Sequence, residues 1–251
     1  FGQDGPYAHR PGFATIAEAL SGFSDLLGEP GGQPLLPPIA VTDEVTALVG
    51  AFATLLALRH AEKTGEGQVV DVNLLESMFQ IMGPLVSAYA HMGYLQPRLG
   101  SGIPYTVPRG TYQTSDGRWV AVSSSADSVA QRVLELIGLA DDPRFASFQG
   151  RTAHRDELEA KMRAWVNARP YDEVMREFSR VDAAIAPVLN MEGIFADEHY
   201  RARGMITEVD GVAMQNVVAR LSKTPGSVRH PGKAFGADTE AVLAALGKKL
   251  P

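Results

Sequence analysis

The chain of 251 residues contains no cysteine, which excludes disulfide bonds and every reaction that needs a thiol. It also lacks an excess of basic residues, because 23 Lys and Arg stand against 29 Asp and Glu. The formal net charge of −6 argues against a nucleic-acid surface. No apolar run is expected to reach the length of about 20 residues that a membrane-spanning helix needs. We therefore expect neither nucleic acid nor a membrane as a partner.

The composition otherwise predicts an ordinary folded enzyme-sized protein. An apolar content of 45% is enough for a sizeable core, and the length allows one or two domains. The absence of cysteine is typical of a reducing compartment, so we expect a cytoplasmic protein. The six histidines are dispersed, without the close spacing of a metal site, and we expect no metal.

Asp43 is the most informative residue of the chain. It follows Ile39-Ala-Val41, which has the composition of a buried strand, and it precedes a helix with apolar residues at helical spacing: Val45, Leu48, Val49, Phe52, Leu55 and Leu56. A carboxylate at a helix start lies near unpaired backbone N–H groups and the positive end of the helix dipole. That position suits a nucleophile in front of a core helix. The alternative is that Asp43, or Thr42, only caps the helix.

The rest of the chain predicts a mixed α/β protein. Residues 68–74 alternate as in a strand, and an apolar helix resumes at Leu75. A Gly- and Pro-rich segment over 100–110 predicts a domain crossing. Beyond it we expect a hairpin around Ser115-Asp-Gly117 and then three amphipathic helices, of which Pro170 opens the last. These are followed by an edge strand over 185–189, a helix capped by Asn190 and a strand over 203–210. The predicted domains are 1–103, 104–210 and a return of 211–251 to the first part.

Four stretches carry a resemblance to a known family: Phe1-Gly-Gln-Asp-Gly-Pro-Tyr7, Asp43 before its helix, Glu62-Lys-Thr-Gly-Glu-Gly-Gln-Val-Val-Asp71 and Leu75-Glu76. In order and spacing they resemble the family III coenzyme A transferases. This superfamily includes carnitine, bile-acid and formyl-CoA transferases and the α-methylacyl-CoA racemases. The likeness continues through Asp116-Gly-Arg-Trp-Val-Ala-Val122 and the segment from Gly236 to Gly247.

The resemblance implies an α/β fold with part of a large Rossmann-like domain and a smaller α/β domain, in an interlocked homodimer. Because the stretch that begins at Phe1 matches an internal segment of family members, we expect a chain that lacks the N-terminal nucleotide-binding-like part. In the family that part supplies much of the pocket for the CoA adenine and phosphates. This expectation agrees with the absence of a Gly-rich phosphate fingerprint here.

For function, the resemblance implies transfer of coenzyme A from an acyl-CoA donor to a carboxylic acid acceptor through a covalent intermediate on Asp43. Acyl-CoA is then a substrate, and no permanently bound cofactor is expected. The segment of Arg10, Pro11, Gly12, Phe13 and Ala14 aligns with residues near the CoA pantetheine, and Gly100, Ser101 and Gly102 align with a glycine-rich lid. Asp71 and Glu76 recur in the family pattern, and we assign them no role.

Phe13 separates two branches of the family. The racemase branch carries a histidine at this distance ahead of the active-site aspartate, as one of two groups that move the α-proton. Phenylalanine has no proton to exchange, so we favour the transferase over the racemase. A third possibility is a non-catalytic module that binds acyl-CoA or serves dimerisation.

Overall fold

The computed structural model describes residues 1–248, which form two compact units. The first unit spans Phe1–Pro187, and the second begins at Val188. The segment over 100–110 lies within the first unit. The domain division at 103 and 210 stays a prediction, as does the return of the C-terminal segment to the first part of the chain.

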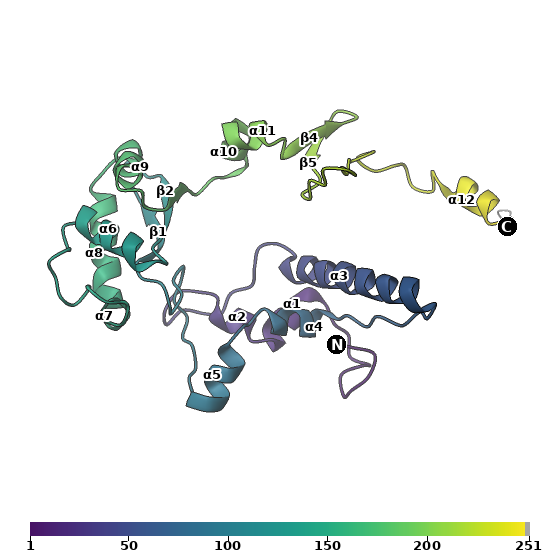
Figure 1. Ribbon diagram of the computed structural model, residues 1–251, viewed down its shortest axis with the longest axis horizontal. Helices are drawn as coiled ribbons and strands as arrows, with labels where there is room; N and C mark the ends of the chain where they lie inside the picture. Colours follow the sequence, from purple (N-terminus) through teal and green to yellow (C-terminus); the bar gives the residue numbers. More distant parts are fainter. Residues whose placement is uncertain (249–251) are drawn as a thin grey trace. The chain divides into compact units, whose positions relative to one another are not determined.

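The first unit begins with five helices, α1 to α5 (Figure 1). They are α1 Ala14–Leu20, α2 Phe23–Leu26, α3 Val41–Thr64, α4 Leu74–Gln80 and α5 Leu85–Met92. Helix α1 contacts α2, α3 and α4, and α3 also contacts α4. Helix α3 ends where Gly65 adopts a left-handed conformation with φ of 79°. The helix predicted from Leu75 is confirmed as α4, and the Asn73 side chain caps it by accepting the Glu76 N–H at 3.0 Å.

The two strands predicted in this region are wrong. Residues 39–41 form no strand, because the Val41 N–H donates to the Ile39 carbonyl at 2.8 Å and α3 already begins at Val41. Residues 68–74 alternate but pair with no neighbour among the described residues, and Val69 is 93% exposed. A strand requires a partner for its backbone groups, which a pattern of side chains cannot supply.

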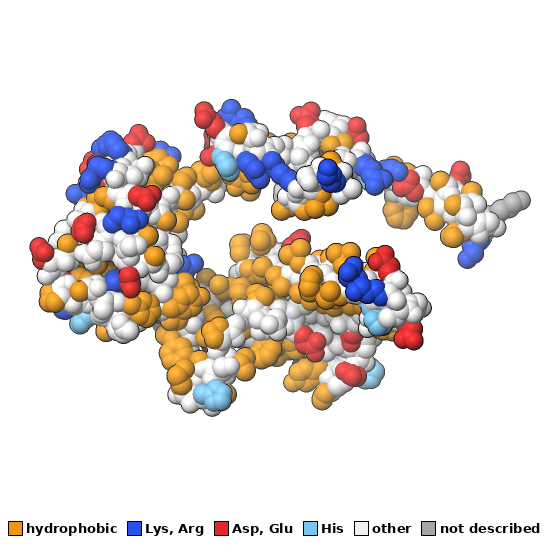
Figure 2. Space-filling view, in the orientation of Figure 1, with side chains coloured by type: hydrophobic (Ala, Val, Ile, Leu, Met, Phe, Trp, Pro, Cys, Tyr) orange, Lys and Arg blue, Asp and Glu red, His pale blue; other side chains and the backbone are white. Residues whose placement is uncertain are grey.

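Helix α3, predicted to be a core helix, is largely exposed in this chain. Its apolar residues include Leu48, Phe52 and Leu55, which are 72%, 65% and 65% exposed. Figure 2 shows hydrophobic side chains gathered over α3. By length and composition alone, α3 could also cross a membrane, which corrects the statement that no apolar segment is long enough. Its uncharged run, from Val45 to Leu58, is shorter than the about 20 residues typical of such helices.

The later part of the first unit contains a small antiparallel sheet. Its strands are β1 Arg109–Gln113, β2 Trp119–Ser123 and β3 Ile185–Pro187, in the order β1-β2-β3. The predicted hairpin is confirmed: Thr111 lies opposite Ala121, and the turn contains Gly117 with φ of 82°. The predicted edge strand is also confirmed as β3, where Pro187 lies opposite Val120.

Four helices, α6 Asp127–Leu136, α7 Phe148–Ala153, α8 Arg155–Asn167 and α9 Tyr171–Arg180, belong with this sheet (Figure 1). The three predicted amphipathic helices are confirmed as α6, α8 and α9, and Pro170 is the N-cap of α9. Their buried faces meet β1 and β2 in one hydrophobic cluster: Tyr112, Val120, Val122, Val133, Met162, Val166, Val174, Phe178 and Ala183. A second cluster joins Val107, Leu134, Phe145 and Leu158. The sequence pattern therefore locates this core correctly.

The second unit contains α10 Met191–Ala196, α11 Glu198–Ala202, β4 Ile206–Val209, β5 Val212–Gln215 and α12 Thr239–Ala245. The predicted Asn190 cap is confirmed, since its side chain accepts the Gly193 N–H at 2.9 Å. The predicted strand corresponds to β4, which pairs with β5 in an antiparallel hairpin. Strand β5 is not among the predicted strands. Asp210 and Gly211 in its turn both have positive φ, 52° and 76°, and an Asp-Gly pair between apolar residues is the signal that predicts such a turn.

Candidate active site

Asp43 lies in the first turn of α3 with an exposed side chain. The N-cap residue is Ala40, and no side chain makes a capping bond there, so neither Asp43 nor Thr42 is the helix cap. Among residues 1–248, no ion pair involves Asp43, and the backbone N–H groups of Thr42 and Asp43 have no hydrogen-bond partner. The geometry therefore presents an accessible carboxylate beside the unpaired backbone N–H of the same residue.

A buried hydrogen bond holds the start of α3 against α1. The Thr42 hydroxyl donates to Oε1 of Glu18 at 2.8 Å. Thr42 is 0% exposed and Glu18, on α1, is 3% exposed. The Thr46 hydroxyl donates to the Thr42 carbonyl at 2.7 Å within α3. The residue before Asp43 is thus fixed from a different element of the fold.

The segment Arg10–Ala14, predicted to contact CoA, leads directly into α1. Phe13 is the N-cap residue of α1 and is 76% exposed. The Arg10 guanidinium lies 4.4 Å from the centroid of the Tyr7 ring and has no ion pair among the described residues. A Cβ atom on Gly12 would come within 2.9 Å of the Phe1 ring, so a side chain there requires the ring to move. The segment is open to a ligand along most of its length.

The structure connects this segment with Asp43 only indirectly. No hydrogen bond or ion pair among residues 1–248 joins Asp43 to Arg10–Ala14 or to Gly100–Gly102. The link to Arg10–Ala14 passes through α1, whose Glu18 binds Thr42. Asp71 accepts the Gln3 N–H at 3.3 Å, which is a structural contact, and the backbone of Glu76 takes part in the cap of α4.

The predicted lid residues Gly100, Ser101 and Gly102 lie in a loop with several tethers. The Gly100 N–H donates to the Gly28 carbonyl at 3.0 Å, and the nearby Arg98 forms an ion pair with Asp25 at 3.0 Å. A further contact comes from the Arg109 guanidinium, which donates to the Ser101 carbonyl at 2.6 Å. Gly100 has φ of 57°, and a Cβ there would meet the Glu29 carboxylate at 2.9 Å. This glycine is therefore favoured by its backbone conformation, whereas the contact with the flexible Glu29 side chain could be relieved by its movement.

Several buried polar groups that the sequence analysis did not single out belong to the core. The Tyr112 hydroxyl donates to Oε2 of Glu159 at 2.5 Å, and the Arg109 N–H donates to Oε1 at 2.9 Å. Burial, and next the Glu159 carboxylate, raise the pKa of Tyr112. Arg151, 3% exposed, donates to the Val107 carbonyl at 3.2 Å and pairs with an aspartate on α6. These contacts join distant elements, so sequence spacing does not reveal them.

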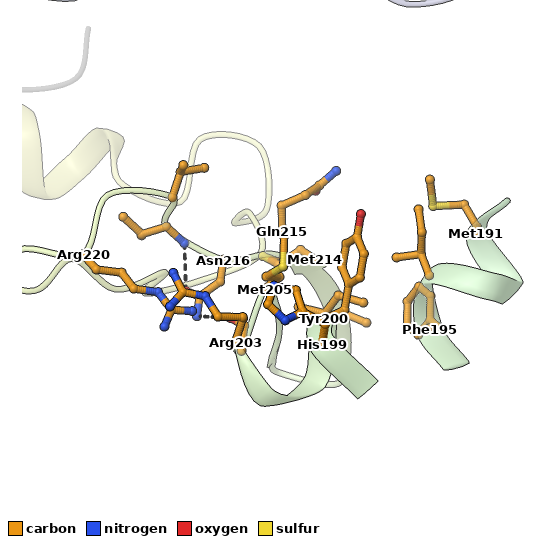
Figure 3. A pocket seen from close by; sticks show the side chains of 16 residues that line it. Met191, Phe195, His199, Tyr200, Arg203, Met205, Met214, Gln215, Asn216 and Arg220 are labelled. Carbon is orange, nitrogen blue, oxygen red and sulfur yellow. Dashed lines mark hydrogen bonds between the residues drawn. The ribbon is translucent and has the colours of Figure 1, made fainter. Parts of the chain in front are cut away.

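A cavity of about 710 Å³ lies in the second unit, between α10, α11 and the β4–β5 hairpin (Figure 3). Its apolar lining includes Phe195, Met205 and Met214, and its cations are Arg203 and Arg220. None of the described residues that line it is acidic, so the cavity suits an apolar ligand with a negative charge. No predicted site residue contributes to it. Its lining comes from these four short elements and from the segments that follow α11 and β5, which meet only in the fold.

Comparison with solved structures defines the fold class. The chain superposes on a CAIB/BAIF family protein from Brucella suis with a TM-score of 0.82 and 27% identity, covering 98% of this chain and 66% of that one. A hypothetical protein from Mycobacterium tuberculosis shares the fold at a TM-score of 0.80 and 21% identity, over 96% of this chain and 65% of that one. The fold is thus the α/β fold of this class, as predicted.

The sequence comparisons give the family. The model of CoA-transferase family III matches residues 1–239, and the chain belongs to this family. It is 38% identical to the succinyl-CoA–L-malate CoA-transferase alpha subunit of Chloroflexus aurantiacus, over 98% of this chain and 60% of that protein. It is 30% identical to the succinate–glutarate CoA-transferase of Agrobacterium fabrum, over 98% of this chain and 63% of that protein. The chain therefore spans about 60% of the length of these curated relatives.

Proposed function

We propose that the protein carrying this chain transfers coenzyme A from an acyl-CoA donor to a carboxylic acid acceptor, with Asp43 as the nucleophile. The observation that carries the proposal is the exposed Asp43 carboxylate in the first turn of α3, which does not cap the helix, in a chain of CoA-transferase family III. An aspartate that makes no cap bond and no ion pair among the described residues has no evident structural task at this position.

The reaction begins when the Asp43 carboxylate attacks the thioester carbonyl of the donor. The C–S bond breaks, CoA leaves as the thiolate, and a mixed anhydride forms. The thiolate then attacks the Asp43 acyl carbon, the anhydride C–O bond breaks, and the donor acid departs as a carboxylate. The product of this half reaction is an aspartyl-CoA thioester. No proton transfer and no ATP are required, because one activated acyl group replaces another.

The second half reverses these steps with the acceptor. Its carboxylate attacks the aspartyl thioester and displaces the CoA thiolate, which then attacks the acceptor side of the new anhydride. Each addition creates an oxyanion, and the unpaired N–H group of Asp43 is the donor nearest in sequence that can stabilise it. In this proposal Arg10–Ala14 contacts the pantetheine, and Gly100–Gly102 limits access of water to the intermediates.

The names of the relatives support a dicarboxylic substrate pair. The relatives act, by name, on succinyl-CoA with L-malate, on succinyl-CoA with D-citramalate, and on succinate with glutarate. We infer a succinyl-CoA donor and an acceptor acid of similar size. Since some relatives are named as alpha and beta subunits, a different second chain is an alternative to the predicted interlocked homodimer. A cytoplasmic location remains part of the proposal.

The test is a CoA-transfer assay on the full-length protein, with succinyl-CoA and a panel of dicarboxylic acids. Asp43→Ala should abolish transfer, and Asp43→Asn should nearly do so because an amide cannot form the anhydride. Glu44→Ala is the matched control, since Glu44 is an exposed carboxylate in the same helical turn. Equal activity of Asp43→Ala and the wild type would refute the covalent mechanism.

A further inference from the structure

We propose that Glu18, acting through Thr42, is a positioning residue that fixes the direction of the Asp43 carboxylate. This proposal rests on the proposed function, because it concerns the same nucleophile. It assigns a task in CoA transfer to a buried carboxylate that the sequence motifs did not single out.

The first observation is the burial of an ionisable side chain on α1. Glu18 is 3% exposed, although glutamate is rarely buried without a specific partner. Its partner is the Thr42 hydroxyl, at 2.8 Å from Oε1. Thr42 is itself 0% exposed, so neither side chain can exchange this hydrogen bond for water without movement of the backbone. The contact is therefore a fixed link between α1 and α3.

The second observation is that the start of α3 lacks a side-chain cap. Ala40, the N-cap residue, offers no side-chain acceptor, so the usual device that orients a first turn is missing. The Glu18–Thr42 bond, immediately beside Asp43, takes its place as the side-chain contact that anchors this turn. Rotation or fraying of the turn would carry the Asp43 side chain with it.

The third observation is the position of Glu18 within α1. The helix starts at Ala14, directly after the segment proposed to hold the pantetheine, and its other end is tied by the Ser21 hydroxyl to the Glu18 carbonyl at 3.1 Å. One short, rigid helix thus connects the proposed CoA contact with the turn that bears the nucleophile. A misplacement of about 1 Å in reacting groups can reduce the rate about 100-fold.

The proposal is tested with variants of Thr42 and Glu18 in the full-length protein. Thr42→Val removes the hydroxyl at nearly constant volume, and Thr42→Ser keeps it. Glu18→Asp withdraws the acceptor by one methylene, and Glu18→Gln keeps an acceptor oxygen in place. Thr46→Val is the matched control, because it removes a hydroxyl one turn further along that binds only the backbone of α3. Steady-state kinetics give kcat and KM, and single-turnover mass spectrometry gives the rate at which Asp43 is acylated.

We expect Thr42→Val and Glu18→Asp to lower kcat and the acylation rate by about 10- to 100-fold, with KM for the donor within about threefold of the wild type. Thr42→Ser, Glu18→Gln and Thr46→Val should keep kcat within about threefold. A purely structural role would lower the amount of folded protein without this separation of kcat from KM. If Thr42→Val fails to fold, the comparison of Glu18→Asp with Glu18→Gln decides the question.

Wild-type kcat in folded Thr42→Val or Glu18→Asp would overturn the positioning role and leave the proposed function intact. Equal loss in Glu18→Asp and Glu18→Gln would also overturn it, because the acceptor oxygen would then not be the feature that matters. The proposed function itself fails by a different result, namely equal transfer by the wild type and Asp43→Ala.

Discussion

The exposed apolar face of α3 predicts how the 251-residue chain behaves when it is prepared alone. Leu48, Phe52 and Leu55 are 72%, 65% and 65% exposed. Full burial of one such side chain contributes about 1.5–3 kcal/mol, so covering these three would contribute several kcal/mol. That sum is comparable with the whole stability of a domain, about 5–15 kcal/mol. We therefore expect the isolated chain to self-associate.

The perturbation is the double substitution Leu48→Gln and Phe52→Gln, with Thr54→Gln as a control on an exposed polar position of the same helix. Size-exclusion chromatography with light scattering, over a range of protein concentrations, measures the mass of the particles. The wild-type chain and the control should form concentration-dependent oligomers, whereas the double variant should shift toward the monomer. Its unfolding temperature should remain close to that of the wild type, because the removed side chains are exposed. A monodisperse wild-type monomer would refute the reasoning.

Three further predictions concern single residues. Burial and Glu159 raise the pKa of Tyr112, so the protonated hydroxyl contributes its full stabilisation of the folded protein below about pH 10. This stabilisation is lost as the pH rises above that value, toward the folded-state pKa. The tyrosinate absorbance of the folded protein near pH 11 should therefore be equal in the wild type and in Tyr112→Phe, and a smaller signal in the variant would contradict the raised pKa. Gly150→Ala should destabilise the folded protein by about 1–3 kcal/mol in urea unfolding, because the new Cβ would clash with the backbone carbonyl oxygen of Arg144; an unchanged midpoint would contradict this packing. Since Phe13 has no exchangeable proton, the full-length protein should not exchange the α-proton of a 2-methylacyl-CoA in deuterium oxide, and rapid deuterium incorporation would favour the racemase.

Local patterns predicted the parts of the fold that local interactions determine. The hairpin around Gly117 is predictable because a Ser-Asp-Gly turn lies between two strand-like segments, and the positive φ of Gly117 agrees with that turn. The helices that contain Val133, Met162 and Phe178 were predicted because their apolar faces repeat at helical spacing and meet in one core. The alternation of apolar residues over 68–74 predicted a strand that the structure lacks, since strand pairing depends on a partner that lies outside the segment.

The sequence predicts single motifs of the candidate site but not the contacts between distant residues. The family motifs located Asp43, and the structure places it in the first turn of a helix whose N-cap residue is Ala40, so the alternative of a cap by Asp43 or Thr42 is wrong. The hydrogen bond between Glu18 and Thr42 spans 24 positions and two helices. No spacing rule connects two such residues, because their contact follows from the packing of α1 on α3.

Direct detection of a covalent intermediate on Asp43 is the measurement that tests the central claim most directly. The full-length protein is incubated with succinyl-CoA, trapped with hydroxylamine, digested and analysed by mass spectrometry. We predict inactivation together with a hydroxamate on the peptide that contains Asp43, and no modification of that peptide in Asp43→Ala or without the acyl-CoA. Active CoA transfer with an unmodified Asp43, or with trapping at another carboxylate, would contradict the account.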